Sequence, residues 1–122
     1  MKLFPGLRLY SYPSCSSCRK AISWLDERNI SFDLVNIADN PPSLEELQTV
    51  IEKLENRKLV FNTRGISYRK LGASYINSLN DEKAIELLHE DGKLIKRPLL
   101  ISNKKDFLIG FKPDNWHDFF LD

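Results

Sequence analysis

The chain contains two cysteines, which stand three residues apart in the segment Cys15-Ser16-Ser17-Cys18. This segment follows a predicted strand and opens a predicted helix, where free backbone N–H groups and the helix dipole stabilise an anion such as a thiolate. We therefore expect Cys15, at the exposed start of the helix, to be a nucleophile. Cys18 lies one turn further on the same side, within disulfide reach, and is expected to attack a mixed disulfide formed at Cys15.

Two other interpretations of the cysteine pair are open. Cysteines at this spacing form half of many zinc sites, but the two histidines, His89 and His117, lie far along the chain without paired-ligand spacing. The cysteines could also be inert and buried, as free cysteines often are. The position between a strand and a helix favours a redox-active dithiol, so we predict no metal site.

The composition excludes several classes of protein. The 18 basic and 17 acidic side chains leave a net charge of +1, whereas counterion release by a nucleic-acid binder needs a large basic excess. No apolar run approaches the ~18–20 residues that span a bilayer, and the first residues lack the pattern of a secretory signal. We expect a cytoplasmic monomer without a direct nucleic-acid or membrane partner.

The charges are nevertheless segregated along the chain. Between Asp26 and Glu55 there are eight acids and two bases, and between Asn56 and Asn80 there are five bases and no acid. Residues 93–112 contain six bases and one acid. These segments are either solvated faces of opposite charge or, for part of the basic set, a site for an anionic ligand or an acidic partner.

The hydrophobic pattern predicts alternating strands and helices. Apolar and polar residues alternate over 7–12, and Ser14 or Ser16 can cap a helix over about 17–28. The remaining predicted elements are a strand at 32–37, a helix opened by the capping box of Ser43 and Glu46, short helical turns within 59–71, a helix at 81–90 closed at Gly92, strands at 98–101 and 107–111, and a last helix from Pro113.

The order of these elements is βαβ, several helices and ββα, which predicts an α/β fold. A βαβ unit implies two parallel strands joined by a right-handed crossover, and a C-terminal hairpin and helix would complete a four-stranded mixed sheet. This plan resembles the thioredoxin-like fold with a helical insertion, at about residues 43–91, between the two halves. With no repeat or linker in the sequence, we expect residues 1–122 to form one domain.

Arg97 and Pro98 form a second feature with chemical consequences. Proline lacks an N–H, so Pro98 suits the first residue of the predicted third strand. In thioredoxin-like folds this position carries a cis proline facing the reactive cysteine, and we therefore predict a cis Arg97–Pro98 bond. Arg97 would then present a planar, charged guanidinium near Cys15, suited to an oxyanion or a thiolate. The alternative is a solvated charge before the strand.

Four segments, distributed from the first strand nearly to the C-terminus, match one protein family. They are YPSCSSCRKA at 12–21, FNTRGISYRKLG at 61–72, LIKRPL at 94–99 and IGFK at 109–112. On these segments the chain resembles the arsenate reductase ArsC family in its broad sense, which includes the Spx and MgsR regulators.

The resemblance implies an arsenate-reductase-like thiol–disulfide oxidoreductase in which Cys15 is the reactive cysteine, Cys18 resolves and Arg97 binds an oxyanion. Plasmid-type reductases of the family hold arsenate with three arginines, and at the other two positions this chain has Asn62 and Lys112. The residues expected to bind the anion or the thiol substrate are Ser14, Ser16, Ser17, Arg19, Asn62, Arg64, Pro98 and Lys112.

The resemblance also implies the cofactors and partners of such an enzyme. It implies no tightly bound cofactor, an oxyanion or disulfide as substrate, and glutathione, a glutaredoxin or a thioredoxin as reductant.

An alternative function follows from the same resemblance. Spx-type regulators use the CxxC pair as a redox switch and bind the C-terminal domain of the RNA polymerase α subunit. This chain shares the segments around Arg64 and Arg97 with them, but it has Glu55-Asn56-Arg57 where the best-known Spx proteins have a glycine turn. The arsenate-reductase-like function is therefore the first expectation, and a redox-sensing regulator is the alternative.

Overall fold

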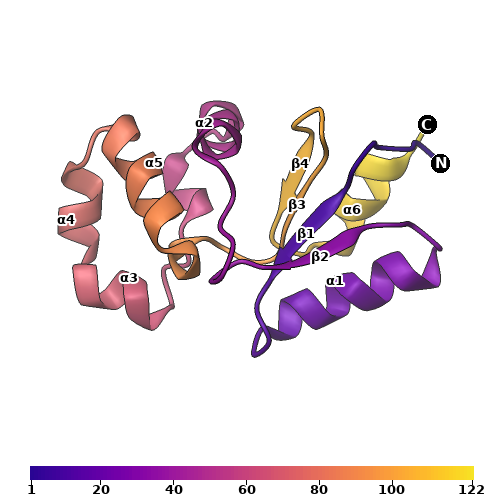
Figure 1. Cartoon of the computed structure of the whole chain (residues 1–122), viewed down its shortest axis with the longest axis horizontal. Helices are drawn as coiled ribbons and strands as arrows, with labels where there is room; N and C mark the ends of the chain where they lie inside the picture. Colours follow the sequence, from indigo (N-terminus) through magenta and orange to yellow (C-terminus); the bar gives the residue numbers. More distant parts are fainter. The chain divides into compact units, whose positions relative to one another are not determined.

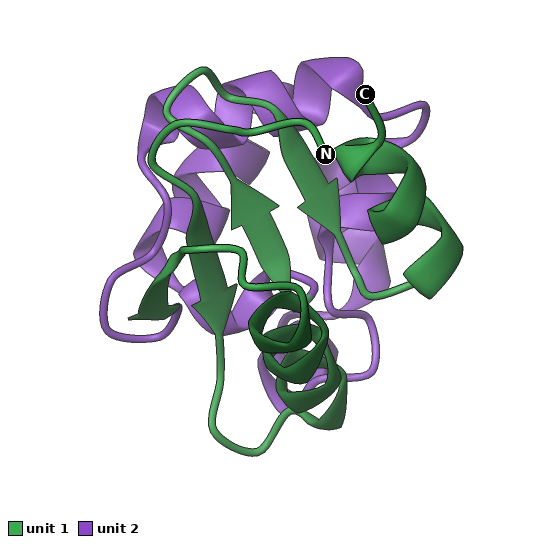
Figure 2. Ribbon diagram, turned by 90° about the vertical axis from the view of Figure 1, so that its right-hand side faces the viewer, with its two compact units in different colours: residues 1–36, 97–122 green, residues 37–96 purple.

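Residues 37–96 interrupt, in sequence, a sheet-containing unit that is built from both ends of the chain (Figure 2). The computed structural model describes residues 1–122, with unit 1 comprising residues 1–36 and 97–122 and unit 2 comprising residues 37–96. The elements (Figure 1) are β1 (Arg8–Ser11), α1 (Ser16–Glu27), β2 (Asp33–Asn36), α2 (Leu44–Lys53), η1 (Arg57–Val60), α3 (Ile66–Leu71), α4 (Ala73–Ser78), α5 (Asp81–Glu90), η2 (Gly92–Leu94), β3 (Leu99–Ile101), β4 (Phe107–Ile109) and α6 (Pro113–Phe120). The expectation of one domain over residues 1–122 stays a prediction.

The sheet of unit 1 has the strand order β2-β1-β3-β4. β1 and β2 run parallel, with Leu9 opposite Leu34, as expected for a βαβ unit whose crossover is α1. β3 runs antiparallel to both β1 and β4, with Leu100 opposite Leu9 on one side and Leu108 on the other. The predicted α/β fold with a four-stranded mixed sheet is therefore confirmed.

One face of this sheet is covered by α1 and α6. Leu9 and Leu100 from the sheet, Leu25 from α1 and Trp116 from α6 are fully buried in one apolar cluster. The Trp116 indole donates to Gly110 O at 3.0 Å, so its single polar atom is satisfied inside the core. This packing holds α1, and with it the cysteine segment at its start, against the sheet.

In unit 2, α2 begins at the capping box that the sequence predicts. Ser43 Oγ accepts from Glu46 N at 3.1 Å, while Ser43 N donates to Glu46 Oε1 at 3.0 Å. α5 has the predicted bounds, and His89 Nδ1 lies 2.8 Å from Pro42 O. Contacts with α5 and this hydrogen bond position α2 within unit 2.

Two local expectations need correction, and one helix was not predicted. The N-cap of α1 is Cys15 rather than Ser14 or Ser16, because its backbone is extended and its sulfur accepts the hydrogen bond that a serine hydroxyl would take. α5 is closed by Asp91, and Gly92 begins η2 instead. α4 carries no sequence signal, since it lacks a capping side chain and buries only Ile76. No helix is both long enough and apolar enough to cross a membrane.

Candidate functional site

Cys15 is held by the backbone at the junction of β1 and α1. Its N–H donates to Tyr12 O at 3.0 Å, and its carbonyl accepts from Arg19 N at 3.2 Å as the first bond of the helix. The same junction is braced from outside, because Arg19 Nη1 donates to Pro13 O at 3.1 Å. The sulfur therefore sits at a fixed point where the free N–H groups of the helix begin.

The two cysteines are close together and differ in accessibility. Cys18 N donates to Cys15 Sγ at 3.2 Å, and both residues are free thiols. Cys15 is partly exposed, whereas Cys18 is 1% exposed. A reagent or substrate in solvent therefore meets Cys15 first, and Cys18 lies behind it.

Burial also separates the two thiols chemically. Burial, the hydrogen bond with Cys15 and the nearby charge of Cys15 raise the pKa of Cys18 from its ordinary 9.0 to about 12. A backbone hydrogen bond from Tyr12 and the positive charge of Arg97 act in the opposite direction but do not offset the rise. Cys18 is therefore a protonated thiol at neutral pH, which supports the prediction that Cys15 is the nucleophile of the pair.

Arg97 lies two residues before β3, beside Tyr12 and close enough to Cys18 for its charge to act on that thiol. The Arg97–Pro98 peptide bond is cis, as predicted. The Arg97 guanidinium lies 4.9 Å from the centre of the Tyr12 ring, which precedes the cysteine segment, and its charge acts on Cys18. Tyr12 is a site residue that sequence reasoning did not single out. The sequence feature that could have identified Tyr12 is its position at the end of the predicted first strand, directly before Pro13 and the cysteine segment.

The other predicted binding residues of unit 1 differ in exposure. Ser14, Ser16 and Lys112 are exposed, and Ser17 is partly exposed. Lys112 occupies the N-cap position of α6 without a side-chain capping bond. Pro98 is buried, and its carbonyl accepts from Gly110 N at 2.8 Å. The binding roles assigned to all of them stay predictions.

Asn62 and Arg64 belong to unit 2, in the turn before α3. Asn62 N donates to Leu94 O at 2.8 Å, and its carbonyl accepts from Gly65 N at 3.1 Å. The side-chain amide lies over the same turn, 2.5 Å from where a Cβ on Gly65 would stand. Arg64 is exposed. The site built here therefore consists of Cys15, Cys18, Arg97 and Tyr12, and anion binding by the two residues of unit 2 stays a prediction.

We expect iodoacetamide to modify Cys15 alone when the folded protein is treated at about pH 7.5. Alkylation requires a thiolate, so burial and a pKa of about 12 should make the initial rate at Cys18 more than about a hundredfold lower. Because Cys18 stays mostly protonated until the pH approaches about 12, its own alkylation rate should keep rising with pH up to that value. Peptide mapping measures both rates, with unfolded protein as the control in which both thiols react. Equal rates in the folded protein would contradict the assignment.

Comparisons with known proteins agree over nearly the whole chain. The family model of the ArsC family matches residues 10–119. The chain is 41% identical to the uncharacterized protein YusI of Bacillus subtilis over 116 residues, 93% of this chain and 97% of that protein. It is 36% identical to the regulatory protein MgsR of Bacillus subtilis over 108 residues, 88% of this chain and 84% of MgsR.

A solved structure shows the same fold. The crystal structure of a possible arsenate reductase from Streptococcus mutans matches with a TM-score of 0.84 and 37% identity, covering 93% of this chain and 98% of that one. The family match includes the cysteine segment, the Arg97–Pro98 bond and the whole of unit 2. By family model, curated relatives and fold together, the chain belongs to the ArsC family.

Proposed function

We propose that the chain is an arsenate-reductase-like thiol–disulfide oxidoreductase that uses Cys15 and Cys18 as its redox pair and acts in the reducing cytoplasm. The observation that carries this proposal is the position of Cys15 Sγ, partly exposed at the N-cap of α1 and 3.2 Å from the N–H of the buried Cys18. This arrangement gives an attacking sulfur and a protected resolving sulfur. Membership of the ArsC family supports the same chemistry.

The exchange takes two steps. The Cys15 thiolate attacks one sulfur of a substrate disulfide, so that a Cys15–substrate disulfide forms, the substrate S–S bond breaks and one substrate thiolate leaves. The Cys18 thiolate then attacks Cys15 Sγ and expels the second substrate thiolate. The substrate disulfide is reduced by two electrons and the cysteine pair is oxidised to a disulfide. A thioredoxin, a glutaredoxin with glutathione, or glutathione itself returns the pair to its dithiol form.

The first step activates the second. Two of the three causes that raise the pKa of Cys18 come from Cys15, namely its hydrogen bond and its charge. Both disappear once the Cys15 sulfur enters a mixed disulfide, whereas the lowering effects of the Tyr12 backbone and of Arg97 remain. Burial, the largest cause of the raised pKa, remains, so the pKa of Cys18 falls only part of the way toward its ordinary value. Resolution therefore follows attack rather than competing with it.

Arg97 and Lys112 are the cations of unit 1 that we assign to an anionic substrate. Arg97 is partly exposed, and its fork can bind two oxygens of an oxyanion or of a glutathione carboxylate. Lys112 is exposed and adds a second positive charge. Arsenate is the oxyanion that the matching Streptococcus mutans structure suggests. In that reaction the Cys15 sulfur forms a bond to arsenic with loss of water. Two glutathione molecules then supply the two electrons that reduce arsenate to arsenite, and they are oxidised to glutathione disulfide.

The test is a pair of turnover assays on wild-type protein. In one, NADPH oxidation is coupled through glutathione reductase to the reduction of a small glutathione mixed disulfide. In the other, arsenate replaces the disulfide and glutathione with glutaredoxin is supplied. We expect turnover in the disulfide assay, with Cys15→Ser as the inactive control. Turnover in the arsenate assay would identify an arsenate reductase. Absence of Cys15-dependent turnover in both would overturn the proposal.

A second candidate function is redox-dependent regulation. The 36% identity to the regulatory protein MgsR favours it, because the same cysteine pair could switch a binding surface instead of turning over substrate. Its partner would be the C-terminal domain of the RNA polymerase α subunit, as in the Spx-type regulators. Purified α-subunit domain should then bind the oxidised protein at least about tenfold more tightly than the reduced protein. Equal or absent binding in calorimetry would exclude this function.

A further inference from the structure

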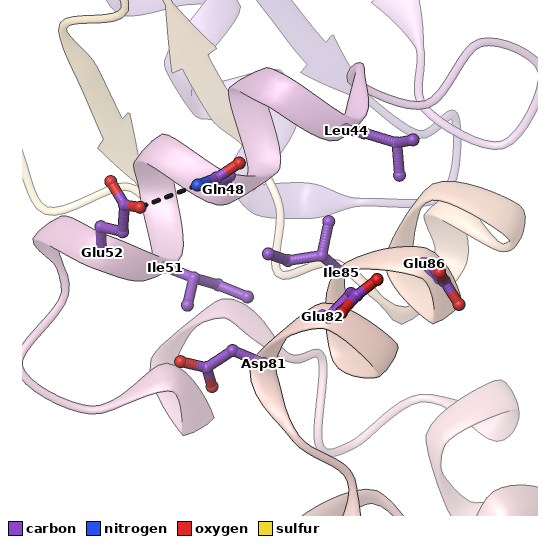
Figure 3. A pocket seen from close by; sticks show the side chains of 8 residues that line it. All are labelled: Leu44, Gln48, Ile51, Glu52, Asp81, Glu82, Ile85 and Glu86. Atoms are coloured by element: carbon purple, nitrogen blue, oxygen red, sulfur yellow. Dashed lines mark hydrogen bonds between the residues drawn. The ribbon is translucent and has the colours of Figure 1, made fainter.

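Unit 2 contains an open groove between α2 and α5 that the redox chemistry does not use. Its lining residues are Leu44, Gln48, Ile51 and Glu52 from α2 and Asp81, Glu82, Ile85 and Glu86 from α5. Figure 3 shows Ile51 and Ile85 pointing into the space between the two helices. Ile51 is nearly buried, while 47% of Leu44 is exposed. The floor of the groove is therefore apolar, and part of it faces solvent.

The charged residues that line the groove are all acidic. Of its eight lining residues, four are acids and none is a base. Asp81 is paired with Arg57 at 2.9 Å, and Glu86 with Lys83 at 3.4 Å. Glu52 accepts a hydrogen bond from Gln48 at 3.0 Å, but neither Glu52 nor Glu82 has a cation within ion-pair distance. Two exposed carboxylates, one on each helix, thus lack a positive partner within the chain.

The spacing of these residues gives the groove a direction. Leu44, Gln48 and Glu52 follow one another at four-residue intervals along α2, and Glu82 and Glu86 do so along α5. The row on α2 runs from Leu44 to Glu52, about 12 Å along the helix. An apolar strip with acidic edges of this length matches about two turns of a helix better than a compact ion or small molecule.

We propose that the α2–α5 groove binds a basic amphipathic helix of a partner protein. Large apolar side chains of that helix would lie on Leu44, Ile51 and Ile85. Lysines or arginines on its flanks would pair with Glu52 and Glu82, the two carboxylates without a cation. The choice of a basic partner rests on charge complementarity, because an acidic or neutral helix would leave both carboxylates partly desolvated and unpaired.

The probe is a fluorescently labelled synthetic helix with leucines along one face and lysines and arginines on its flanks. Its dissociation constant is measured by fluorescence anisotropy at about 50 mM salt, where exposed ion pairs are weakly screened. Two double variants, in which carboxylates are replaced by amides, distinguish binding at the groove from non-specific electrostatic attraction of the basic peptide to the protein. Glu52→Gln with Glu82→Gln changes the groove, and Asp26→Asn with Asp33→Asn makes the same charge change on exposed residues of unit 1.

We expect the groove variant to bind the probe about fivefold more weakly or worse, and the control variant to bind within about twofold of wild type. A second probe with serines in place of the leucines should also bind at least about tenfold more weakly, because it cannot cover the apolar floor. Equal loss in both variants, equal binding of both probes, or no binding of the leucine probe would each overturn the proposal.

The result is independent of the thiols. Cys15→Ser protein should bind the probe as wild type does, so failure of the proposed function would leave this inference standing. Failure of the groove proposal would likewise leave the proposed thiol chemistry standing, because neither groove carboxylate belongs to the cysteine site.

Discussion

Replacing Cys15 with serine is expected to lower the rate of thiol–disulfide exchange by about a thousandfold or more. A serine hydroxyl is not ionised at neutral pH and cannot form a mixed disulfide. Cys18 cannot take over the first step, because it is 1% exposed and burial is the largest cause of its raised pKa. The rate is measured by stopped-flow reduction of an aromatic disulfide that releases a coloured thiolate.

The companion variant, Cys18→Ser, should show the opposite behaviour. It keeps the attacking sulfur but removes the resolving one, so the Cys15–substrate disulfide should accumulate. Intact mass spectrometry should then find one substituent per chain, whereas wild-type protein should end two hydrogens lighter, as an internal disulfide. If Cys15→Ser kept the wild-type rate, or if Cys18→Ser accumulated no adduct, the assigned roles of attacking and resolving sulfur would be wrong.

Gly92→Ala is expected to destabilise the protein by about 3 kcal/mol or more. A Cβ on Gly92 would stand 1.9 Å from Ile37 O and 2.9 Å from the Ile37 carbonyl carbon, both of them buried backbone atoms. Gly92 does not have a positive φ, so the cost comes from the close approach of two backbone segments and not from backbone conformation. Backbone atoms cannot rotate away as a side chain can, and the start of η2 would have to separate from residue 37.

Gly65→Ala is the matched control for this prediction. It lies in the same unit and also lacks a positive φ, but its new Cβ would meet mainly the side-chain amide of Asn62. That amide can rotate, so we expect a loss below about 1.5 kcal/mol. Urea denaturation of both variants measures the two losses. A loss at Gly92→Ala no larger than that of the control would show that residues 37 and 92 separate at little cost.

The sequence was informative where short-range patterns decide the outcome. The alternation of apolar residues in β1, the capping box at Ser43 and the helix-starting Pro113 each act within a few residues, and each marks an element where it stands. The cysteine segment was placed correctly for the same reason, since a strand followed by a helix leaves it at a helix N-terminus. The bounds of α5 followed from its apolar spacing, whereas its cap at Asn80 was found only in the structure.

Local sequence patterns did not predict features that depend on the surrounding structure. Three residues, Ser14, Cys15 and Ser16, could each accept the capping hydrogen bond, and the turn geometry after β1 selected the cysteine. α4 had no signal because only Ile76 is buried, so its helical state depends on contacts with α3 rather than on its own periodicity. Gly92 was expected to stop a helix, yet its small size is required by a carbonyl 55 positions away in sequence.

The sequence by itself determined the family, the order of the strands and helices, and the presence of two cysteines one helical turn apart. The sequence also predicted that Cys15 is the more exposed thiol. Only the tertiary structure decided the almost complete burial of Cys18, the position of Arg97 beside Tyr12, and which face of α2 and α5 remains open. The physical reason is that burial, the electrostatic environment of a thiol and the shape of a groove all depend on atoms brought together from distant segments. The spacing of residues along the chain does not determine the distances between such segments in the folded protein.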